Sequence, residues 1–195
     1  KCPNACYTGI EVMENCADLA RRNLLLNGLQ EKIAIICGDF RRLPAELAKT
    51  GVFQTTETNC RQKKYDKIIC NPPYQPMSSK RISPVRERAA ARFELNGTLA
   101  EFFAAAKALL TPNGGFSLVV PAARNDEVKA IAEKEGFFCR RCQAVRSIGD
   151  RKQLLTLWDF GKKPCQTVVL PSVNICLADE VCKKHWPESS VYSSK

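Results

Sequence analysis

The stretch YDKIICNPPYQP, residues 65–76, decides how the rest of this sequence is interpreted. Its apolar first half predicts a buried strand. Prolines donate no backbone hydrogen bond to a sheet, so the strand must end at Asn71. A polar and an aromatic side chain, Asn71 and Tyr74, therefore flank a rigid double proline at a strand end. This arrangement predicts a functional site at that end.

The residue types in this turn suit chemistry on an exocyclic amine. The Asn71 side-chain oxygen and the Pro72 carbonyl are expected to accept hydrogen bonds from both amine hydrogens, held rigid by the fixed φ angles of Pro72 and Pro73. The nitrogen then becomes pyramidal and directs its lone pair at an electrophile. Tyr74 offers an aromatic face on which a flipped base stacks. Such catalysis depends on positioning and electrostatics, without a tuned general base.

Strand-like and helix-like segments alternate along the chain. The capping-box pair Thr98 and Glu101 predicts where one helix begins, and Gly136 predicts where another ends. The alternation predicts an α/β fold, a mostly parallel sheet covered by helices with an antiparallel hairpin near the C-terminal end. The expected strands are 5–12, 32–39, 65–71, 116–121, 137–148, 153–162 and an apolar run at 166–177; the expected helices are 14–28, 98–110 and 125–136.

Polar side chains close three consecutive predicted strands, and ligands of open α/β sheets bind at such carboxyl ends. Glu11 is suited to accept hydrogen bonds from the two hydroxyls of a ribose. Asp39 is suited to accept from an adenine amino group, with Phe40 against the ring. Asn71 closes the third strand. One acid alone is more simply a strand-end cap, but three consecutive ends with suitable groups predict a nucleotide-type site.

Composition is that of one basic domain of 195 residues, with 30 Lys and Arg against 20 Asp and Glu and a net charge of +10. This charge favours a nucleic-acid partner, with a solvated basic surface as the alternative. The 11 cysteines are interpreted as mostly buried thiols, Cys37 and Cys70 among them. The CRRC pair Cys139 and Cys142 has too few companions, with one histidine in the chain, and no metal site is expected. No membrane span or signal peptide is apparent, so a soluble cytoplasmic protein is expected.

The segments GIEV, GDF and YDKIICNPPY resemble the class I S-adenosylmethionine-dependent methyltransferases that modify amino groups. More specifically, RERAAARFE, TLAEFFAAAKALLTPNGGFSLVVP and DRKQLLTLWDFGK resemble the tRNA adenine-N6 methyltransferases. The resemblance covers about residues 7–195. It implies a Rossmann-like fold and S-adenosyl-L-methionine as cofactor. It further implies tRNA as partner, without a membrane or an obligate protein partner, and methylation of the adenine beside the anticodon of a valine tRNA.

The resemblance also implies roles for individual residues. Glu11 would bind the cofactor ribose, Asp39 and Phe40 its adenine, and residues 71–74 the target amine. Phe93 stands where relatives often carry histidine. The segment after the tetrapeptide would contact RNA, with a solvated loop as the alternative, through Arg88, Arg92 and Glu94.

The glycine-rich turn that the family places before the GIEV strand is not among the ten residues ahead of Glu11. The expectation is therefore an internal fragment, cut at both ends, in which the first and central strand of the fold is missing. Such a fragment is not expected to bind cofactor or to be active alone. Residues 1–160 are interpreted as a partial methyltransferase domain and residues 161–195 as its C-terminal extension.

Two further functions remain open. The same tetrapeptide serves methyltransferases of release-factor glutamine, of rRNA guanine N2 and of DNA adenine N6. The other alternative is a non-catalytic RNA-binding remnant. The basic charge favours nucleic acid over a protein substrate. Retention of both acids together with the tetrapeptide favours an enzyme over a remnant.

Overall fold

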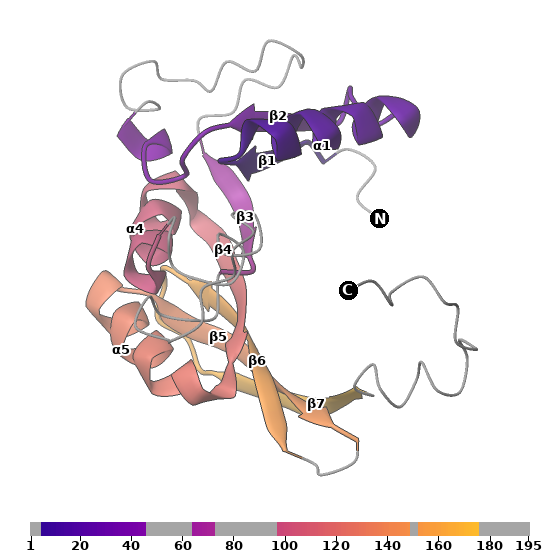
Figure 1. Ribbon diagram of the computed structural model, residues 1–195. Helices are drawn as coiled ribbons and strands as arrows, with labels where there is room; N and C mark the ends of the chain where they lie inside the picture. Colours follow the sequence, from indigo (N-terminus) through magenta and orange to yellow (C-terminus); the bar gives the residue numbers. More distant parts are fainter. Residues whose placement is uncertain (1–4, 46–63, 73–96, 149–151, 176–195) are drawn as a thin grey trace, which may run out of the picture.

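The computed structural model describes residues 5–45, 64–72, 97–148 and 152–175. These residues form a two-stranded sheet and a five-stranded sheet, with helices packed against them (Figure 1). The elements are β1 (Tyr7–Glu11), α1 (Glu14–Leu26), β2 (Ile33–Cys37), β3 (Tyr65–Cys70), α4 (Leu99–Leu109), β4 (Leu110–Pro121), η2 (Ala122–Arg124), α5 (Asn125–Glu135), β5 (Phe138–Ser147), β6 (Gln153–Gly161) and β7 (Val168–Ile175).

The small sheet consists of β1 and β2, which pair in parallel and are joined by α1. The pairing runs from Tyr7 opposite Ile33 to Glu11 opposite Cys37. Helix α1 buries Ala17 completely and ends at Leu26. Gly28 follows with a φ of 63°, a left-handed conformation that glycine adopts without strain. The helix predicted over 14–28 is therefore confirmed, with its end two residues earlier.

The large sheet has the strand order β3-β4-β6-β5-β7. The pairs β3/β4 and β5/β7 are parallel, whereas β6 is antiparallel to both β4 and β5. The predicted α/β fold with an antiparallel hairpin is therefore confirmed. Strand β4 begins at Leu110, earlier than the predicted 116, because Leu110 pairs with Tyr65 and a register shift before Lys67 accommodates the extra residues.

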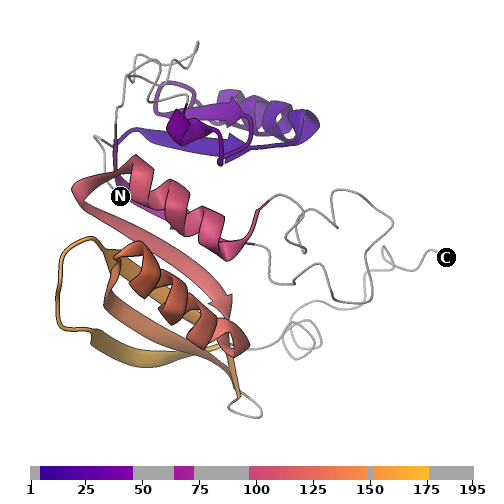
Figure 2. The ribbon, with the colours of Figure 1, turned by 90° about the vertical axis from the view of Figure 1, so that its left-hand side faces the viewer.

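Helices α4 and α5 cover one face of the large sheet, and Figure 2 looks onto them with the strands behind. The predicted capping box of Thr98 and Glu101 begins α4. The core lies beneath these helices around Phe103, whose side chain is fully buried. Its ring meets Phe116, Phe137 and Phe160 edge-on at centroid distances of 5.1, 5.5 and 5.4 Å.

Strand β5 contains a bulge at Arg140, because its pairing with β6 shifts between Cys139 and Arg141. In a regular strand, residues three apart point to opposite faces. Here Cys139 lies opposite Phe160 and Cys142 opposite Trp158, and both cysteines pack against the core under the helices. The bulge thus brings the two cysteines of the CRRC motif to one face.

The two cysteines that were expected to be buried differ in their exposure. Cys37 is exposed, so the expectation that it is buried is wrong; it is the last residue of β2, where the strand leaves the sheet. Cys70 is half-buried at the end of β3, and burial raises the pKa of its thiol to about 12. No helix in the described ranges is both long and apolar enough to cross a lipid bilayer.

Candidate functional site

A groove of about 430 Å³ lies between β1 and β3. Its floor is formed by the apolar side chains of α4 that face the gap, including Phe102, Ala105 and Leu109. The groove runs along both strands and reaches their carboxyl ends. The sequence-predicted residues that line it are Glu11, Asp39, Phe40 and Asn71.

These residues lie at the carboxyl ends of three strands. Glu11 is the last residue of β1 and pairs with Cys37, the last residue of β2. The Gly38 amide donates to the Glu11 carbonyl at 2.8 Å, which holds the Asp39 turn beside the end of β1. Asn71 follows β3 directly. The juxtaposition expected from three consecutive strand ends is therefore present in the structure.

Glu11 has a local hydrogen bond as well as a place in the groove. Its Oε1 accepts from the Met13 amide at 2.9 Å, just before α1 begins. This bond fixes the carboxylate at the mouth of the groove. A carboxylate has several lone pairs, so it can accept further hydrogen bonds while this one is kept.

Asp39 is held by a residue that the sequence interpretation missed, Arg41. The Asp39 carboxylate accepts from the Arg41 amide at 2.9 Å and from its guanidinium at 2.5 to 2.9 Å. The side-chain hydrogen bonds from Arg41 are the main reason why the pKa of Asp39 lies below its usual value. Asp39 is therefore ionised at neutral pH and acts only as an acceptor. The sequence does contain a signal for this pair, since Arg41 follows Asp39 by two residues.

Phe40 lies against a second aromatic ring, from α4. Its ring stacks on Phe102 of α4, with centroids 4.1 Å apart and planes at 10°. A Cβ on Gly97 would come within 2.8 Å of the Phe40 ring, so the glycine allows the chain to pass close to it. Phe102 thus joins Phe40 as an aromatic wall of the groove.

The tetrapeptide is described only in its first half. Asn71 is exposed at the groove and Pro72 is buried. The remaining predicted site residues lie outside the described part of the chain. These residues are Pro73, Tyr74, Arg88, Arg92 and Glu94.

The groove separates two strand edges. Among the described residues, β1 pairs only with β2 and β3 only with β4. The hydroxyl of Tyr65, at the start of β3, hydrogen-bonds the Thr8 side chain on β1, and burial raises its pKa. Because β1 and β3 are edge strands of their sheets, their backbone N–H and C=O groups face the groove.

Sequence comparisons connect the chain with RNA-modifying enzymes. A curated tRNA1(Val) (adenine(37)-N6)-methyltransferase of Bacteroides fragilis is 28% identical over 166 residues, which are 85% of this chain and 59% of that protein. The protein of the same name from Porphyromonas gingivalis is 27% identical over 169 residues, 86% of this chain and 60% of its own. The chain spans about three fifths of the length of these relatives. No protein-family model matches the sequence.

Structural comparisons address the fold. A predicted O-methyltransferase of Agrobacterium tumefaciens superposes with a TM-score of 0.57 at 16% identity, covering 86% of this chain and 67% of that one. A candidate methyltransferase solved in complex with SAH gives 0.53 at 14% identity, covering 80% and 38%. The chain has a Rossmann-like fold, which it shares with these two solved structures.

Metal ligands do not gather in the described ranges. No group of three or more His, Cys, Asp or Glu side chains lies close enough there to hold a metal ion. Cys139 lies beside Cys165, whose thiol donates to the Cys139 carbonyl at 3.6 Å. Burial, together with the neighbouring thiols, raises the pKa of Cys139 to about 11. The protonated thiol is a poor metal ligand.

Proposed function

We propose that this chain is part of an S-adenosylmethionine-dependent methyltransferase that modifies N6 of an adenine in tRNA, the adenine beside the anticodon of a valine tRNA. The observation that carries the proposal is that Glu11, Asp39 and Asn71, which close or follow β1, β2 and β3, line one groove. The names of the curated relatives support the substrate.

The groove residues fit an adenosine-bearing cofactor by their chemistry. Asp39 is an acceptor-only carboxylate, which matches the donor hydrogens of an adenine amino group. The Glu11 carboxylate matches the two donors of a ribose. The stacked pair of Phe40 and Phe102 provides an apolar surface for a purine. When bound, the cofactor would supply an electrophilic methyl group.

On the substrate side, Asn71 and Pro72 would hold the target amine. Their two carbonyl oxygens accept its two hydrogens, and this arrangement favours the pyramidal nitrogen whose lone pair points away from the acceptors. Proline fixes the backbone, so little reorganisation is needed as charge develops. Tyr74 would stack on the base, and Arg88, Arg92 and Glu94 would contact the RNA. The net charge of +10 supports a polyanionic substrate.

We also propose that an extended segment fills the groove between β1 and β3 and joins the two sheets into one. The backbone groups along both edges and the apolar floor from α4 support a strand at this place. A glycine-rich turn after that strand would complete the cofactor site at the same strand ends. Residues 161–195 would then extend the same domain as residues 1–160, since β7 pairs with β5.

The test has two steps. Calorimetry compares cofactor binding by the 195-residue chain with binding by a longer version that adds a strand and a glycine-rich turn. Transfer of labelled methyl groups is then measured on unmodified valine tRNA and on the same tRNA with adenine 37 replaced by guanine. Transfer only to the adenine-bearing tRNA is expected. Transfer to rRNA, DNA or a release factor instead would replace the substrate, and absence of cofactor binding in both versions would favour an RNA-binding remnant.

A further inference from the structure

Strand β5 carries two thiols on one face of the large sheet. Because of the bulge at Arg140, Cys139 lies opposite Phe160 and Cys142 opposite Trp158, and both cysteines pack against the core under α4 and α5. Both thiols are free and partly buried. The pair has no part in the proposed methylation, whose groove lies between β1 and β3.

The Cys139 thiol points along the strand towards Cys142. Its Sγ donates to the Arg141 carbonyl at 3.5 Å, and this carbonyl belongs to the peptide bond that joins Arg141 to Cys142. The two cysteine side chains also hydrogen-bond each other. Cys165, by contrast, donates its thiol to the backbone carbonyl of Cys139 at 3.6 Å. The contacts of the Cys139 sulfur therefore favour Cys142 over Cys165 as its partner.

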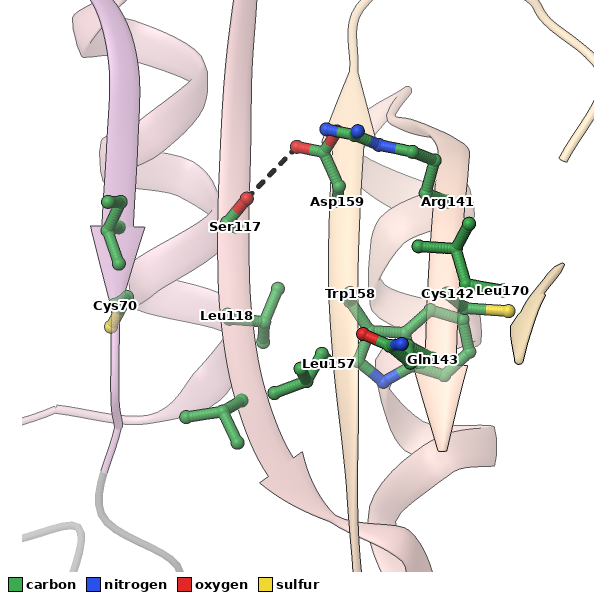
Figure 3. Close-up of a pocket in the computed structure, with 12 residues that line it drawn as sticks. Cys70, Ser117, Leu118, Arg141, Cys142, Gln143, Leu157, Trp158, Asp159 and Leu170 are labelled. Atoms are coloured by element: carbon green, nitrogen blue, oxygen red, sulfur yellow. Dashed lines mark hydrogen bonds and ion pairs between the residues drawn. The ribbon is translucent and has the colours of Figure 1, made fainter. Parts of the chain in front are cut away.

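The opposite face of the sheet holds the bulge in place through two consecutive arginines. Arg141 donates to the Asp159 carboxylate at 2.9 Å and Arg140 at 3.3 Å, and Figure 3 shows the Arg141 guanidinium beside this carboxylate. A Cβ on Gly115 would overlap the Arg140 guanidinium, and one on Gly161 would lie 3.1 Å from its Cδ, so both glycines leave space for Arg140. Consecutive residues of a regular strand point to opposite faces. These contacts therefore stabilise the bulged form that brings the two thiols together.

The pairing register gives the two cysteines a spacing that a disulfide can span. Their partners Phe160 and Trp158 are two residues apart on β6, so Cys139 and Cys142 are separated by two steps of the ladder rather than three. Two steps of a strand correspond to about 6.4–6.8 Å between Cα atoms. The Cα atoms of a disulfide lie about 4.4–6.8 Å apart. Without the bulge, three steps and opposite faces would exclude the bond.

We propose that Cys139 and Cys142 form a modification site that a peroxide converts into a disulfide, closed across the bulge on the face away from Asp159. Peroxide first oxidises the Cys142 sulfur to a sulfenic acid, its O–O bond breaks, and the released hydroxide leaves as water with the thiol proton. The Cys139 sulfur then attacks the sulfenic sulfur. The S–S bond forms, the S–O bond breaks, and the hydroxyl leaves as a second water with the Cys139 proton. Two thiols and one hydrogen peroxide thus give one disulfide and two waters.

The order of the two steps follows from the surroundings of Cys139. Burial raises the pKa of its thiol to about 11, and the neighbouring thiols add to this effect. The thiol is therefore protonated at neutral pH, and the thiolate is the form that reacts with peroxide. Cys139 is the slow nucleophile, which suits the second step, where the sulfenic sulfur is already held beside it.

The test is peptide mapping, because trypsin cleaves after both arginines of the CRRC motif and so separates the two cysteines. The 195-residue protein is treated with hydrogen peroxide, its remaining thiols are blocked with N-ethylmaleimide, and the digest is analysed by mass spectrometry without reductant. Peptides 135–140 and 142–146 are expected to appear joined, with a mass two hydrogens below their sum, and to separate on addition of dithiothreitol. This joined pair should exceed any joined peptide that contains Cys165 by about tenfold or more.

Two serine variants provide the second arm. Cys142→Ser should leave peptide 135–140 with a blocked thiol and no partner. The matched control Cys165→Ser, on the exposed thiol beside Cys139, should leave the joined pair unchanged. Recovery of peptides 135–140 and 142–146 only in separate, blocked form would overturn the proposal, and so would a link of Cys139 to Cys165 in preference to Cys142. Neither cofactor nor tRNA enters these measurements, so failure leaves the proposed function untouched.

Discussion

Lys67 on β3 and Asp159 on β6 form a 2.5 Å ion pair that passes over the intervening strand β4. Ser117 on β4 donates to the same carboxylate oxygen at 3.0 Å. One buried carboxylate therefore ties three neighbouring strands together. The strand that carries Lys67 also carries Asn71 at its end, so this network supports the strand that delivers the tetrapeptide to the groove.

Protonation of Asp159 should destabilise the fold in acid. Burial acts to raise its pKa, but the hydrogen bonds from Lys67, Arg141 and Ser117 outweigh burial and lower the pKa to about 2. A carboxyl with a depressed pKa contributes stability above its unfolded value of 3.8 and loses it as the pH falls towards 2. The contribution at neutral pH is on the order of 1–2 kcal/mol.

Urea unfolding between pH 7 and pH 2 measures this effect. Asp159→Asn should lower the free energy of unfolding at neutral pH and flatten its dependence below pH 4. Asp126→Asn is the matched control, because the Asp126 side chain is fully exposed. Identical pH dependence of Asp159→Asn and the unmodified protein would contradict the role of the network.

Asn71→Ala should remove methyl transfer while cofactor affinity stays within about twofold. The reason is that Asn71 would contact the amine, and an interaction made in the transition state affects turnover more than binding. A loss of at least about 100-fold in the rate of transfer is expected from comparable hydrogen-bonding groups. Asn27→Ala, an exposed residue after α1, serves as the control. Turnover close to that of the unmodified enzyme would remove Asn71 from the mechanism.

Asp39 and Arg41 should affect cofactor binding in opposite ways. Asp39→Ala removes the proposed acceptor for the adenine amino group and should weaken binding by about tenfold. Arg41→Gln should leave affinity unchanged or improve it, because Arg41 competes for the same carboxylate. Calorimetry of cofactor binding by both variants distinguishes the roles of the two residues. The variants are made in the version extended by a strand and a glycine-rich turn if only that version binds cofactor. Equal losses in both would mean that Arg41 itself contacts the ligand.

Phe103→Ala should cost about 3–5 kcal/mol of stability, because the ring is fully buried among three others and leaves a cavity. Phe138→Ala is the matched control, since Phe138 is 39% exposed at the start of β5. Denaturant unfolding of the two variants gives the difference. A loss below about 1 kcal/mol for Phe103→Ala would mean that the core relaxes around the missing ring.

Local signals in the sequence predicted most elements of the fold. The pair Thr98 and Glu101 correctly placed the start of α4, and Gly136, with a φ of 74°, ends α5 as predicted. These signals succeed because capping and left-handed residues act within one turn of the chain. The strand ends at Glu11 and Asn71 were equally readable, because polar residues after apolar runs mark where a strand leaves the sheet.

Contacts between segments that are distant in the sequence could not be predicted from the sequence. The stacking of Phe40 on Phe102 joins residues from separate elements, which the spacing of apolar residues within one helix does not reveal. The network around Asp159 draws on four strands, and its members Lys67 and Asp159 are 92 residues apart in the sequence. Such pairings depend on strand order and on the bulge at Arg140, and neither leaves a periodic trace in the sequence.

The bulge at Arg140 has a consequence for how this strand tolerates changes in chain length. Arg140 of β5 has no residue paired with it on β6. Deletion of Arg140 would therefore restore a regular ladder, and Cys139 would stay opposite Phe160 and Cys142 opposite Trp158. Deletions elsewhere in the strand would instead turn every following side chain to the wrong face. Position 140 is thus a point where related chains can differ by one residue without repacking, and where an alignment gap carries structural meaning.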